Sequence, residues 1–456
     1  MGAPAIIIAY LMATLPACAD TIEAALARAY QTNPQLTAQR AFVRATDENV
    51  PQALSGYRPR VAITANGGVQ YTDFVSGTGS GPGVGLHGKQ YPRSVGMTIS
   101  QTVFNGYQTA NRTRGAEAQV SAAREGLRVL EQNVLFAAAT VYMDFLRDSA
   151  VLEVQRSNVR VLEQTLGQTR DRFRVGDVTQ TDVAQSEAQL ASGRSQMLAA
   201  ESILTTTRGN FFRIIGSEPT ALAAGSPVDR FLPGTLESAI GLARSENPNV
   251  TAALFGVDVA FLQVKVNEGA LFPTISLQAN VQQSYEQQLT VSRQFNAAAL
   301  GQVSIPIYQG GGEYALIRQS KETLAQQRLN LEQTRDQARS NVVQAWGQLL
   351  AGRAQVASAQ AQVLASETAL NGVRDEARVG QRTTLDVLNA QQALVNARVA
   401  LVTSQHDRVV ASYSVLNAVG RLSPTILNLN TSIYDPSVHY HQVRDSWAGV
   451  RSPGGN

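Results

Sequence analysis

The sequence contains little that could bind a metal or form a redox centre. It has one cysteine and four histidines among 456 residues, which argues against a disulfide framework and against a cysteine/histidine metal site. Charged residues make up 16% of the chain, below the roughly 25% of an average soluble protein. The 38 basic and 35 acidic residues are spread along the chain, whereas nucleic-acid-binding proteins concentrate their basic charge. We therefore expect no cofactor, no metal and no nucleic-acid partner.

Catalytic signatures are missing as well. The sequence has no G-x-x-x-x-G-K-[ST] phosphate-binding loop, no G-x-S-x-G nucleophile turn and no cluster of histidines. Its carboxylates are scattered along segments of helical periodicity, where a solvated surface is the simplest interpretation. We expect that the protein is not an enzyme and has no catalytic residues.

The N-terminus, by contrast, has the features of an export signal. Residues 1–19 carry no charged side chain, and Ala17 and Ala19 place small residues at positions −3 and −1 of a cleavage site. We predict a signal peptide over residues 1–19. A membrane anchor is the weaker alternative, because the apolar run is shorter than the ~18 residues that span a bilayer, and lipidation of Cys18 is a second alternative. No later apolar run reaches that length, so we expect no transmembrane helix, and the exported chain is periplasmic, secreted or an outer-membrane β-barrel.

The chain contains an internal tandem duplication. Thr21–Pro34 resembles Thr235–Pro248 at an offset of 214 residues, and Arg174–Val183 resembles Arg378–Val387 at an offset of 204. The first copy is therefore ten residues longer, and the glycine-rich stretch Ser76–Gly88 is predicted to be the long loop that holds them. Repeats of this length are two copies of one architectural unit rather than a solenoid.

The duplication predicts how the chain is divided. We expect a signal peptide at 1–19, a first repeat at 20–216, a linker at 217–234, a second repeat at 235–420, and a C-terminal tail at 421–456 whose end is disordered. Each repeat would contain a helix, a strand pair, a long helix, a tight tip and a return helix.

Each repeat has two segments with the alternating pattern of β-strands. Ile275, Leu277, Ala279 and Val281 alternate with polar residues, and weaker alternation occurs at 61–71, 97–103 and 303–307. Each segment is about ten residues long with tyrosine or phenylalanine near its ends, as in strands that cross a membrane at a tilt. A soluble, half-buried hairpin is the alternative by pattern alone, but the export signal favours a barrel.

The remaining segments predict long helices. Residues 108–173 contain no proline, and a 66-residue helix would be about 100 Å long. Apolar residues recur every seven positions in three series: Phe145, Leu152, Val159, Leu166 and Phe173; Val342, Leu349, Val356, Val363 and Leu370; Leu388, Val395, Val402, Val409 and Leu416. A period of seven indicates helices that pack along a common seam. A cytosolic coiled-coil rod would leave the strands, the duplication and the signal unexplained.

This order of elements resembles the TolC family of outer-membrane efflux proteins from Asp20 to about Ser423. The most specific motifs are Asn33-Pro34 and Asn247-Pro248, the segment Ile305–Gly311, and two Val-Gly tips. The resemblance implies an α+β membrane protein that functions as a homotrimer. Four strands from each protomer would complete a transmembrane β-barrel in the outer membrane of a Gram-negative bacterium, in contact with its lipid. The helices would form a coiled-coil α-helical barrel in the periplasm, and residues 217–234 with the tail after Gly420 would form an equatorial region around it.

The resemblance also implies a passive exit duct. In the family, a periplasmic adaptor and an inner-membrane pump of the RND, ABC or MFS class dock at the helical tips, here Val175, Gly176, Val379 and Gly380. The cargo would leave through the trimer, in drug efflux or in type I secretion. Stretches 76–88 and 286–295 would be extracellular loops.

A periplasmic gate is implied near the tips. Asp386 matches the first carboxylate of a ring at the narrowest point, and Asn389, one turn away on the same helix face, replaces the second. Threefold symmetry would give a ring of three carboxylates.

A latch beside this ring is implied as well. Arg382 matches the arginine that latches the closed gate, with Thr181 and Asp182 as its expected partners on the neighbouring tip helix. Ala377 occupies the position of the latch tyrosine, so fewer hydrogen bonds should hold this gate closed. A solvated charge is the simpler alternative for Arg382.

Two other classes of protein are compatible with parts of the pattern. A trimeric coiled-coil surface adhesin with a barrel anchor would place its strands at one end of the chain, whereas here each repeat has a central strand pair. A periplasmic coiled-coil adaptor would need no ten-residue amphipathic strands with aromatic ends.

Overall fold

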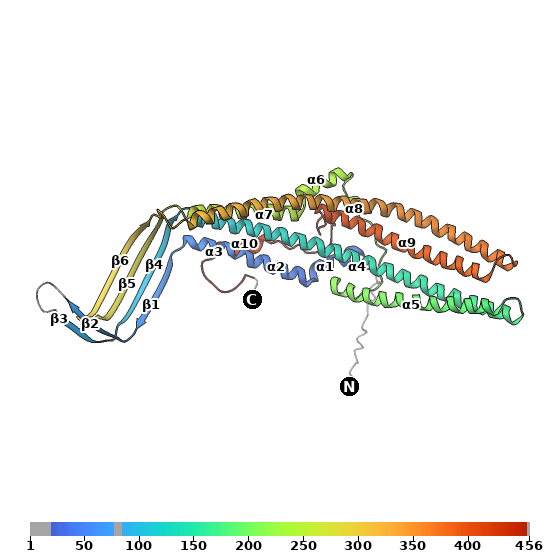
Figure 1. The fold of residues 1–456 in the computed structure, drawn as a ribbon, viewed down its shortest axis with the longest axis horizontal. Helices are drawn as coiled ribbons and strands as arrows, with labels where there is room; N and C mark the ends of the chain where they lie inside the picture. The colour runs from blue at the N-terminus through green and yellow to red at the C-terminus, as the bar shows by residue number, and fades with distance from the viewer. Residues whose placement is uncertain (1–19, 77–83, 454–456) are drawn as a thin grey trace, which may run out of the picture. The chain divides into compact units, whose positions relative to one another are not determined.

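The computed structural model describes residues 20–76 and 84–453, and these form two compact units (Figure 1). The unit that we call the helical unit comprises the chain up to Gln39, Leu127–Pro248 and Asp336–Tyr434; the sheet unit comprises Arg40–Gly126, Asn249–Arg335 and the chain from Asp435. Each unit takes segments from both predicted repeats. The predicted signal peptide, with Ala17, Cys18 and Ala19, lies outside the described residues, as does the end of the tail beyond residue 453.

The elements follow the predicted order in both halves of the chain. The first half contains α1 (Ile22–Thr32), α2 (Pro34–Asp47), α3 (Asn49–Leu54), the short 3-10 turn η1 (Ser55–Tyr57), β1 (Arg60–Gly67), β2 (Gln70–Ser76), β3 (Val84–Gln90), β4 (Arg93–Asn105), α4 (Gln108–Arg174) and α5 (Gln180–Ile215). The second contains α6 (Leu236–Glu246), α7 (Pro248–Gly269), β5 (Thr274–Gln288), β6 (Val291–Ser304), α8 (Gly312–Arg378) and α9 (Thr384–Val419). The turn η2 (Asp229–Phe231) lies in the linker and α10 (Ser437–Val443) in the tail.

The helix lengths agree with a duplicated chain. The long helices α4 and α8 each have 67 residues, and the return helices α5 and α9 each have 36. The proline-free segment predicted to be helical is the helix α4, so that prediction is confirmed.

Most of the residues in the seven-residue series are buried in the protomer. The buried members are Leu152, Val159, Leu166, Val342, Leu349, Leu370, Leu388, Val395, Val409 and Leu416. Phe173, at the end of its series beside a tip, is 42% exposed. The seven-residue period therefore identifies a packing seam of the protomer, from which Phe173 is an exception.

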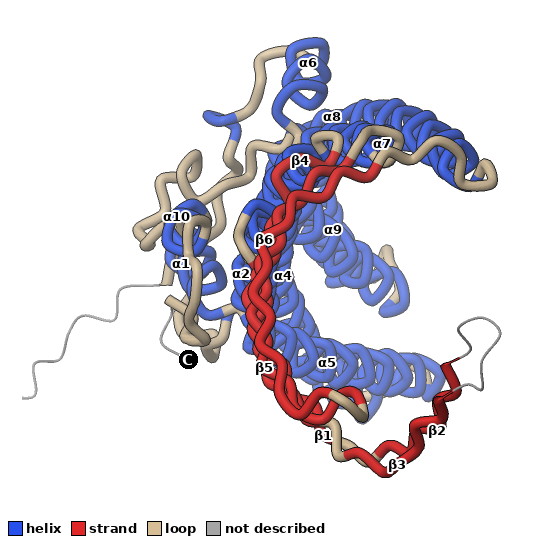
Figure 2. The backbone as a smooth tube through the Cα atoms, turned by 90° about the vertical axis from the view of Figure 1, so that its left-hand side faces the viewer, coloured by secondary structure: helices blue, strands red, loops and turns tan. Residues whose placement is uncertain are grey.

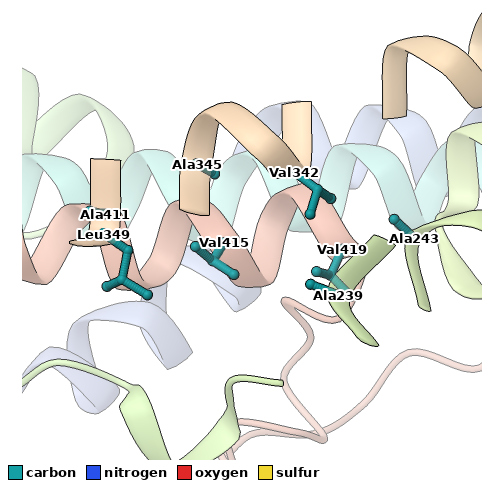
Figure 3. Close-up of a cluster of buried hydrophobic side chains, with 8 residues drawn as sticks. All are labelled: Ala239, Ala243, Val342, Ala345, Leu349, Ala411, Val415 and Val419. Atoms are coloured by element: carbon teal, nitrogen blue, oxygen red, sulfur yellow. The ribbon is translucent and has the colours of Figure 1, made fainter. Parts of the chain in front are cut away.

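One part of this seam joins three helices of the helical unit. Figure 3 shows small apolar side chains of α6, α8 and α9 packed together, namely Ala239, Ala243, Val342, Ala345, Leu349, Ala411, Val415 and Val419. Alanine and valine are short, so the helix backbones can approach closely while their side chains interdigitate.

The two Asn-Pro motifs attach each short helix to the end of a return helix. Asn33 Nδ2 donates to the carbonyl of Ile214 at 3.4 Å, and Asn247 Nδ2 donates to the carbonyl of Ala418 at 2.9 Å. These carbonyls belong to the last turns of α5 and α9, where helices have no internal donors for them. The motifs thus stabilise the same junction in both repeats.

Glycine ends both return helices at this junction. Gly216 and Gly420 have left-handed backbone conformations, with φ of 83° and 91°, which glycine adopts without steric cost. A Cβ on Gly420 would lie 2.6 Å from the Cα atom of Asn247. The position therefore requires glycine both for its backbone angle and for the close approach.

The strands form one four-stranded and one two-stranded antiparallel sheet, both in the sheet unit. The larger sheet has the order β1-β4-β5-β6, and the smaller is the hairpin β2-β3. Figure 2 shows that the larger sheet is strongly curved. Its register shifts between Thr102 and Phe104, where β4 pairs with β5.

Two loop predictions were wrong in part. The stretch 76–88 was expected to be a loop, and its residues 77–83 lie outside the described residues, but its second part belongs to β3, which pairs with β2 from Gln70↔Gln90 to Ser76↔Val84. Glycine contributes no side-chain alternation, so the pattern could not reveal this strand. The stretch 286–295 is also mostly strand, because β5 continues to Gln288 and β6 begins at Val291. Most residues of these strand ends are polar, so the alternating signal is weak there.

One stretch bears on the expectation of no transmembrane helix, which stays a prediction. Among the described residues, Leu236–Gly269 is long and apolar enough to cross a membrane by length and composition alone, and its apolar window has a mean hydropathy of 1.3. The stretch is divided at Asn247, whose extended backbone ends α6.

The glycine at the end of α9 gives a stability prediction. Gly420→Ala should lower the free energy of unfolding by more than about 1 kcal/mol, because alanine at positive φ is strained and its Cβ would collide with Asn247. Gly372→Ala is the matched control, because that glycine lies inside α8 with no other side chain or distant backbone within 4 Å of the place that a Cβ would take, and alanine favours helix there. Thermal unfolding followed by circular dichroism should show a lower midpoint for the Gly420 variant alone; equal midpoints would contradict the prediction.

Candidate functional site: a two-faced sheet and two helical tips

The four-stranded sheet has one apolar face. Val61 pairs with Ile99, Ile99 with Ala279, and Ala279 with Ala299, and residues directly opposite each other share a face. The register therefore places the following residues on one side: Val61, Ile63, Ala65, Val95, Met97, Ile99, Ile275, Leu277, Ala279, Val281, Ala297, Ala299, Gly301 and Val303. Gln101, opposite Leu277, and Gln283, opposite Val95, are polar exceptions on this side. The predicted alternation is thus confirmed as a predominantly apolar surface.

The opposite face is predominantly polar. It carries Thr64, Asn66, Ser94, Thr98, Ser100, Thr102, Ser276, Gln278, Asn280, Gln282, Ser284, Gln294, Asn296 and Gln302, with Ala62, Gly96, Ala298 and Leu300 as exceptions. A sheet that is apolar on one side and polar on the other suits a wall between hydrocarbon and a water-filled lumen.

The apolar face is exposed in the protomer. Val61 is 61% exposed, Ile63 75% and Val303 61%. Exposed apolar surface of this extent is costly in water and favourable in lipid. The burial pattern therefore supports a lipid-facing surface.

Aromatic residues flank the sheet at both ends. Tyr57, Phe104 and Tyr107 lie at the end next to the helices, whereas Tyr91 and Tyr285 lie at the far end. The ten or so residues between these levels match the apolar band, about 25 Å tall, of an outer-membrane barrel. Such girdles place amphipathic rings at the two membrane surfaces.

The sheet is open in the protomer. β1 and β6 are its two edge strands, and each edge presents backbone N–H and C=O groups on one side. Lipid cannot hydrogen-bond these groups, so the sheet can span a membrane only when other strands pair with both edges.

Two tight turns form the helical tips. Val175 and Gly176 connect α4 to α5, and Val379 and Gly380 connect α8 to α9. Gly176 and Gly380 have φ of 78° and 79°, as expected where a helix must reverse its direction. The side chains of Val175 and Val379 are 80% and 71% exposed. The predicted docking residues are therefore accessible at the ends of two helical hairpins.

Asp182 and Asp386 have the same local role in the two tips. Asp182 Oδ2 accepts hydrogen bonds from Thr179 N at 2.9 Å and Thr179 Oγ1 at 2.7 Å, and Asp386 Oδ2 accepts from Thr383 N at 3.0 Å and Thr383 Oγ1 at 2.9 Å. Each aspartate thus completes a capping box at the start of a return helix. These hydrogen bonds hold the pKa of both carboxyl groups below the ordinary value of 3.8, so both are charged at neutral pH.

Arg382 is paired within its own tip. Its Nε donates to Glu376 Oε2 at 2.8 Å, and both side chains are about half exposed (52% and 46%). Thr181 and Asp182, its predicted partners, lie at the start of α5, where the Asp182 carboxylate accepts a hydrogen bond from the backbone N–H of Thr179. The structure contains a single protomer, so a contact between neighbouring protomers at Arg382 stays a prediction.

A groove between the two hairpins was missed in the sequence. Its volume is about 750 Å³, and it is lined by Val161, Gln164, Thr165, Gln168, Thr169, Asp171, Arg172, Asp177, Arg374, Ala377, Arg378, Thr384 and Val387. Next to it, Leu388 of α9 packs against Leu162, Leu166 and Val183 of the other hairpin, and Gln189 donates to Gln392 at 3.0 Å. The seven-residue series that contains Leu388 indicated that this face of α9 packs against another helix. Periodicity alone does not identify which helix that is.

The remaining predicted gate residue is Asn389, which is exposed on α9, three positions after Asp386. Ala377 lines the groove between the hairpins. The structure thus brings the predicted tip and gate residues together at one end of the helical unit, on α5, α8, α9 and the two turns.

Comparison with known proteins identifies a matching family. The sequence profile of the family described as "Outer membrane efflux protein" matches residues 25–217 and 239–421. The outer membrane efflux protein BepC of Brucella suis is 40% identical over 443 residues, which cover 96% of this chain and 94% of BepC. The alkaline protease secretion protein AprF of Pseudomonas aeruginosa is 24% identical over 77% of this chain and 74% of AprF.

Solved structures share the fold. The CmeC outer membrane channel of Campylobacter jejuni has a TM-score of 0.78 and 16% identity, with coverage of 93% of this chain and 89% of CmeC. At this level of identity the likeness concerns the fold alone.

The two faces of the sheet can be tested with a pair of arginine substitutions. Ala279→Arg places a charge in the middle of the apolar face and should cost about 2–4 kcal/mol in the membrane-inserted state. Gln278→Arg, one residue away on the polar face, is the matched control and should be tolerated. The measurement is the amount of folded protein recovered from outer membranes; equal recovery of the two variants would show that neither face contacts hydrocarbon.

Proposed function

Because this chain belongs to the outer membrane efflux protein family, we propose that a periplasmic adaptor binds to its two helical tips. We also propose that Asp386 contributes a negative charge to the periplasmic gate next to these tips. Members of the family are passive channels of the outer membrane and not enzymes. The protein is accordingly an outer-membrane exit duct for efflux or type I secretion, and the family implies a trimer that works with an adaptor and an inner-membrane pump.

The observation that supports the duct most directly is the two-faced, open sheet. Its apolar face meets lipid, its polar face lines water, and its two free edges demand neighbouring strands. Three copies related by a threefold axis satisfy both edges of every copy, because β6 of one protomer can pair with β1 of the next. Closure of the sheet and formation of the pore are then the same event.

Docking at the tips is supported by the exposure of Val175 and Val379. Each valine projects from a turn whose glycine permits a tight reversal. An exposed apolar side chain at the end of a rigid hairpin is suited to a small hydrophobic socket on a partner. The groove between the hairpins would add polar contacts from Arg172, Arg374 and Arg378.

The gate proposal assigns a ring of three carboxylates to Asp386. Its pKa keeps it charged, and charged rings in a narrow lumen attract ions of opposite sign. Asn389 would add a neutral polar ring one turn away, and Arg382 would hold the closed state by pairing with Thr181 and Asp182 of a neighbouring tip helix. Formation of the latch would then require Arg382 to exchange the ion pair with Glu376 that it makes within the protomer for contacts with the neighbouring tip helix.

We favour small-molecule efflux over protein secretion as the transport process. The relative that is 40% identical over nearly the whole chain is named an efflux protein, whereas the protease secretion protein AprF is 24% identical. The pump class (RND, ABC or MFS) would be identified by mass spectrometry of proteins crosslinked to the tips in intact cells.

The gate can be tested in planar bilayers. Asp386→Asn should lower the preference for cations over anions several-fold, because the ring loses its charge while asparagine can still accept the hydrogen bond from Thr383. Asp182→Asn is the control for selectivity: it alters the equivalent capping box and should leave selectivity unchanged, although loss of its charge should weaken the latch with Arg382 and raise the conductance. Arg382→Ser should raise the single-channel conductance by weakening the closed state. Parental selectivity in the Asp386 variant would remove this residue from the constriction.

The docking tips can be tested by adaptor crosslinking in cells. Val175→Asp and Val379→Asp should each reduce the crosslinked adaptor and the export of a pump substrate by about tenfold, as expected when a charge replaces an apolar anchor. Gln381→Asp introduces the same charge close to Val379 and should have a small effect. The amount of trimer on semi-native gels should be equal in all three variants; unchanged crosslinking in both valine variants would contradict docking at the tips.

A further inference from the structure

The C-terminal tail is attached firmly to the sheet unit. In α10, His439 Nδ1 lies 3.0 Å from Oδ2 of Asp47, an α2 residue that is fully buried. Tyr440 packs with Val50 of α3 and Val120 of α4, and Arg124 lies over the Tyr440 ring at 5.1 Å. A buried carboxylate requires partners of this kind, so the contacts fix the position of the residues that follow α10.

The residues that follow α10 contact the end of the sheet that lies next to the helices. Arg58, which ends η1 two residues before β1 begins, donates from Nη1 to the carbonyl of Ser446 at 2.6 Å. The guanidinium of Arg58 also lies over the Trp447 ring at 4.7 Å. The carbonyl of Tyr57 accepts a hydrogen bond from Gln101 of β4 at 3.2 Å, so this corner is fixed to the sheet as well.

The indole is nevertheless exposed. Trp447 is 72% exposed and Val450 is fully exposed, although the preceding turn of the tail is docked. Tyr57, beside Arg58, is 48% exposed. A large aromatic side chain held in place by its backbone and by a cation, yet left open on its other side, is arranged for contact with something outside the protomer.

The surroundings indicate a membrane surface. β1 begins at Arg60, and its next apolar residues, Val61 and Ile63, belong to the lipid-facing side of the sheet. Figure 2 shows α10 on the convex side of the curved sheet, which is the outer side once the sheet closes into a barrel. The contacts with Arg58 place Trp447 at the level where the apolar band of the sheet ends, and α10, which precedes it in the chain, lies on the outer side.

The charges near the indole are mostly positive. Arg58 lies over the ring, and Arg451 follows in the tail, whereas Asp445 is the acidic residue just before this segment. Arginine beside tryptophan suits the interfacial region of a bilayer, where the indole lies among headgroups and the cations face phosphates.

We infer that segment 446–451 is a membrane-interface anchor, in which Trp447 inserts among the phospholipid headgroups at the periplasmic surface of the outer membrane and Arg58 faces their phosphates. The inference rests on the outer-membrane duct described above. Its effect would be to fix the height of the sheet in the bilayer and to tie the tail to the barrel.

The chain offers a direct test, because it has two tryptophans, Trp346 and Trp447. Trp346 lies in α8 against the apolar cluster of the helical unit. The Trp346→Phe variant leaves Trp447 as the fluorescent reporter, and Trp447→Phe leaves Trp346 as the matched control. Both full-length variants would be reconstituted in vesicles of phosphatidylethanolamine and phosphatidylglycerol that carry bromine at shallow or deep acyl positions.

We expect shallow bromine to reduce Trp447 emission about twofold, deep bromine to reduce it less, and aqueous iodide to have little effect, as for an interfacial indole. Trp346 emission should not respond to brominated lipid. Quenching of Trp447 by iodide alone would show a tail in water, and quenching by neither agent would show that a neighbouring protomer covers it; both results would overturn the inference. Ion conductance measured in the same vesicles reports on the duct independently of the quenching.

Discussion

Backbone hydrogen bonding in lipid is the constraint on which the rest of this structure depends. Four strands with unpaired edges at β1 and β6 cannot remain in hydrocarbon, where an unsatisfied N–H or C=O group costs several kcal/mol. The edges therefore require neighbouring copies, and a closed ring of copies such as the trimer of the family meets this requirement. The polar face then encloses water, so a channel results without a site for chemistry.

The helical unit meets a different requirement, since each protomer must contribute long helices that remain in register with one another. The seven-residue seams supply the side-to-side packing. The ends of the helices depend on a few polar contacts: the capping boxes of Thr179 and Thr383, and the asparagines that bind the last carbonyls of α5 and α9. Apolar packing thus sets how the helices associate, and capping sets where they begin and end.

Periodicity in the sequence was sufficient for much of this architecture. The absence of proline and the seven-residue period predicted the long helices, and Gly176 and Gly380 marked the turns between them. Alternation from Ile275 to Val281 predicted the two faces of the sheet. These features depend on local geometry, which a single chain reveals through spacing alone.

Features that depend on contacts between distant segments could not be predicted in this way. The strand β3 is rich in glycine and has no alternating pattern, so its pairing with β2 was missed. The family resemblance gave Asp182 and Asp386 different roles, whereas the structure gives both the same cap, because their hydrogen-bond partner lies three residues away in each tip. The groove between the hairpins and the attachment of Trp447 to Arg58 arise from packing between segments far apart in the chain.

The equal lengths of α4 and α8, and of α5 and α9, have an evolutionary consequence. Removal of one seven-residue period from α4 and its equivalent from α5 would shorten the first hairpin by about 10 Å and leave the second unchanged. Leu388 would then face a different turn of the first hairpin, and the two tips would no longer end at the same level. Insertions and deletions in these helices should therefore be tolerated only in matched sets. Each set would add or remove whole seven-residue periods in both helices of a hairpin and in both repeats. Relatives adapted to a periplasm of different depth would differ by such matched sets. The length of the helical hairpins would therefore change in coupled steps of whole periods and not by single residues.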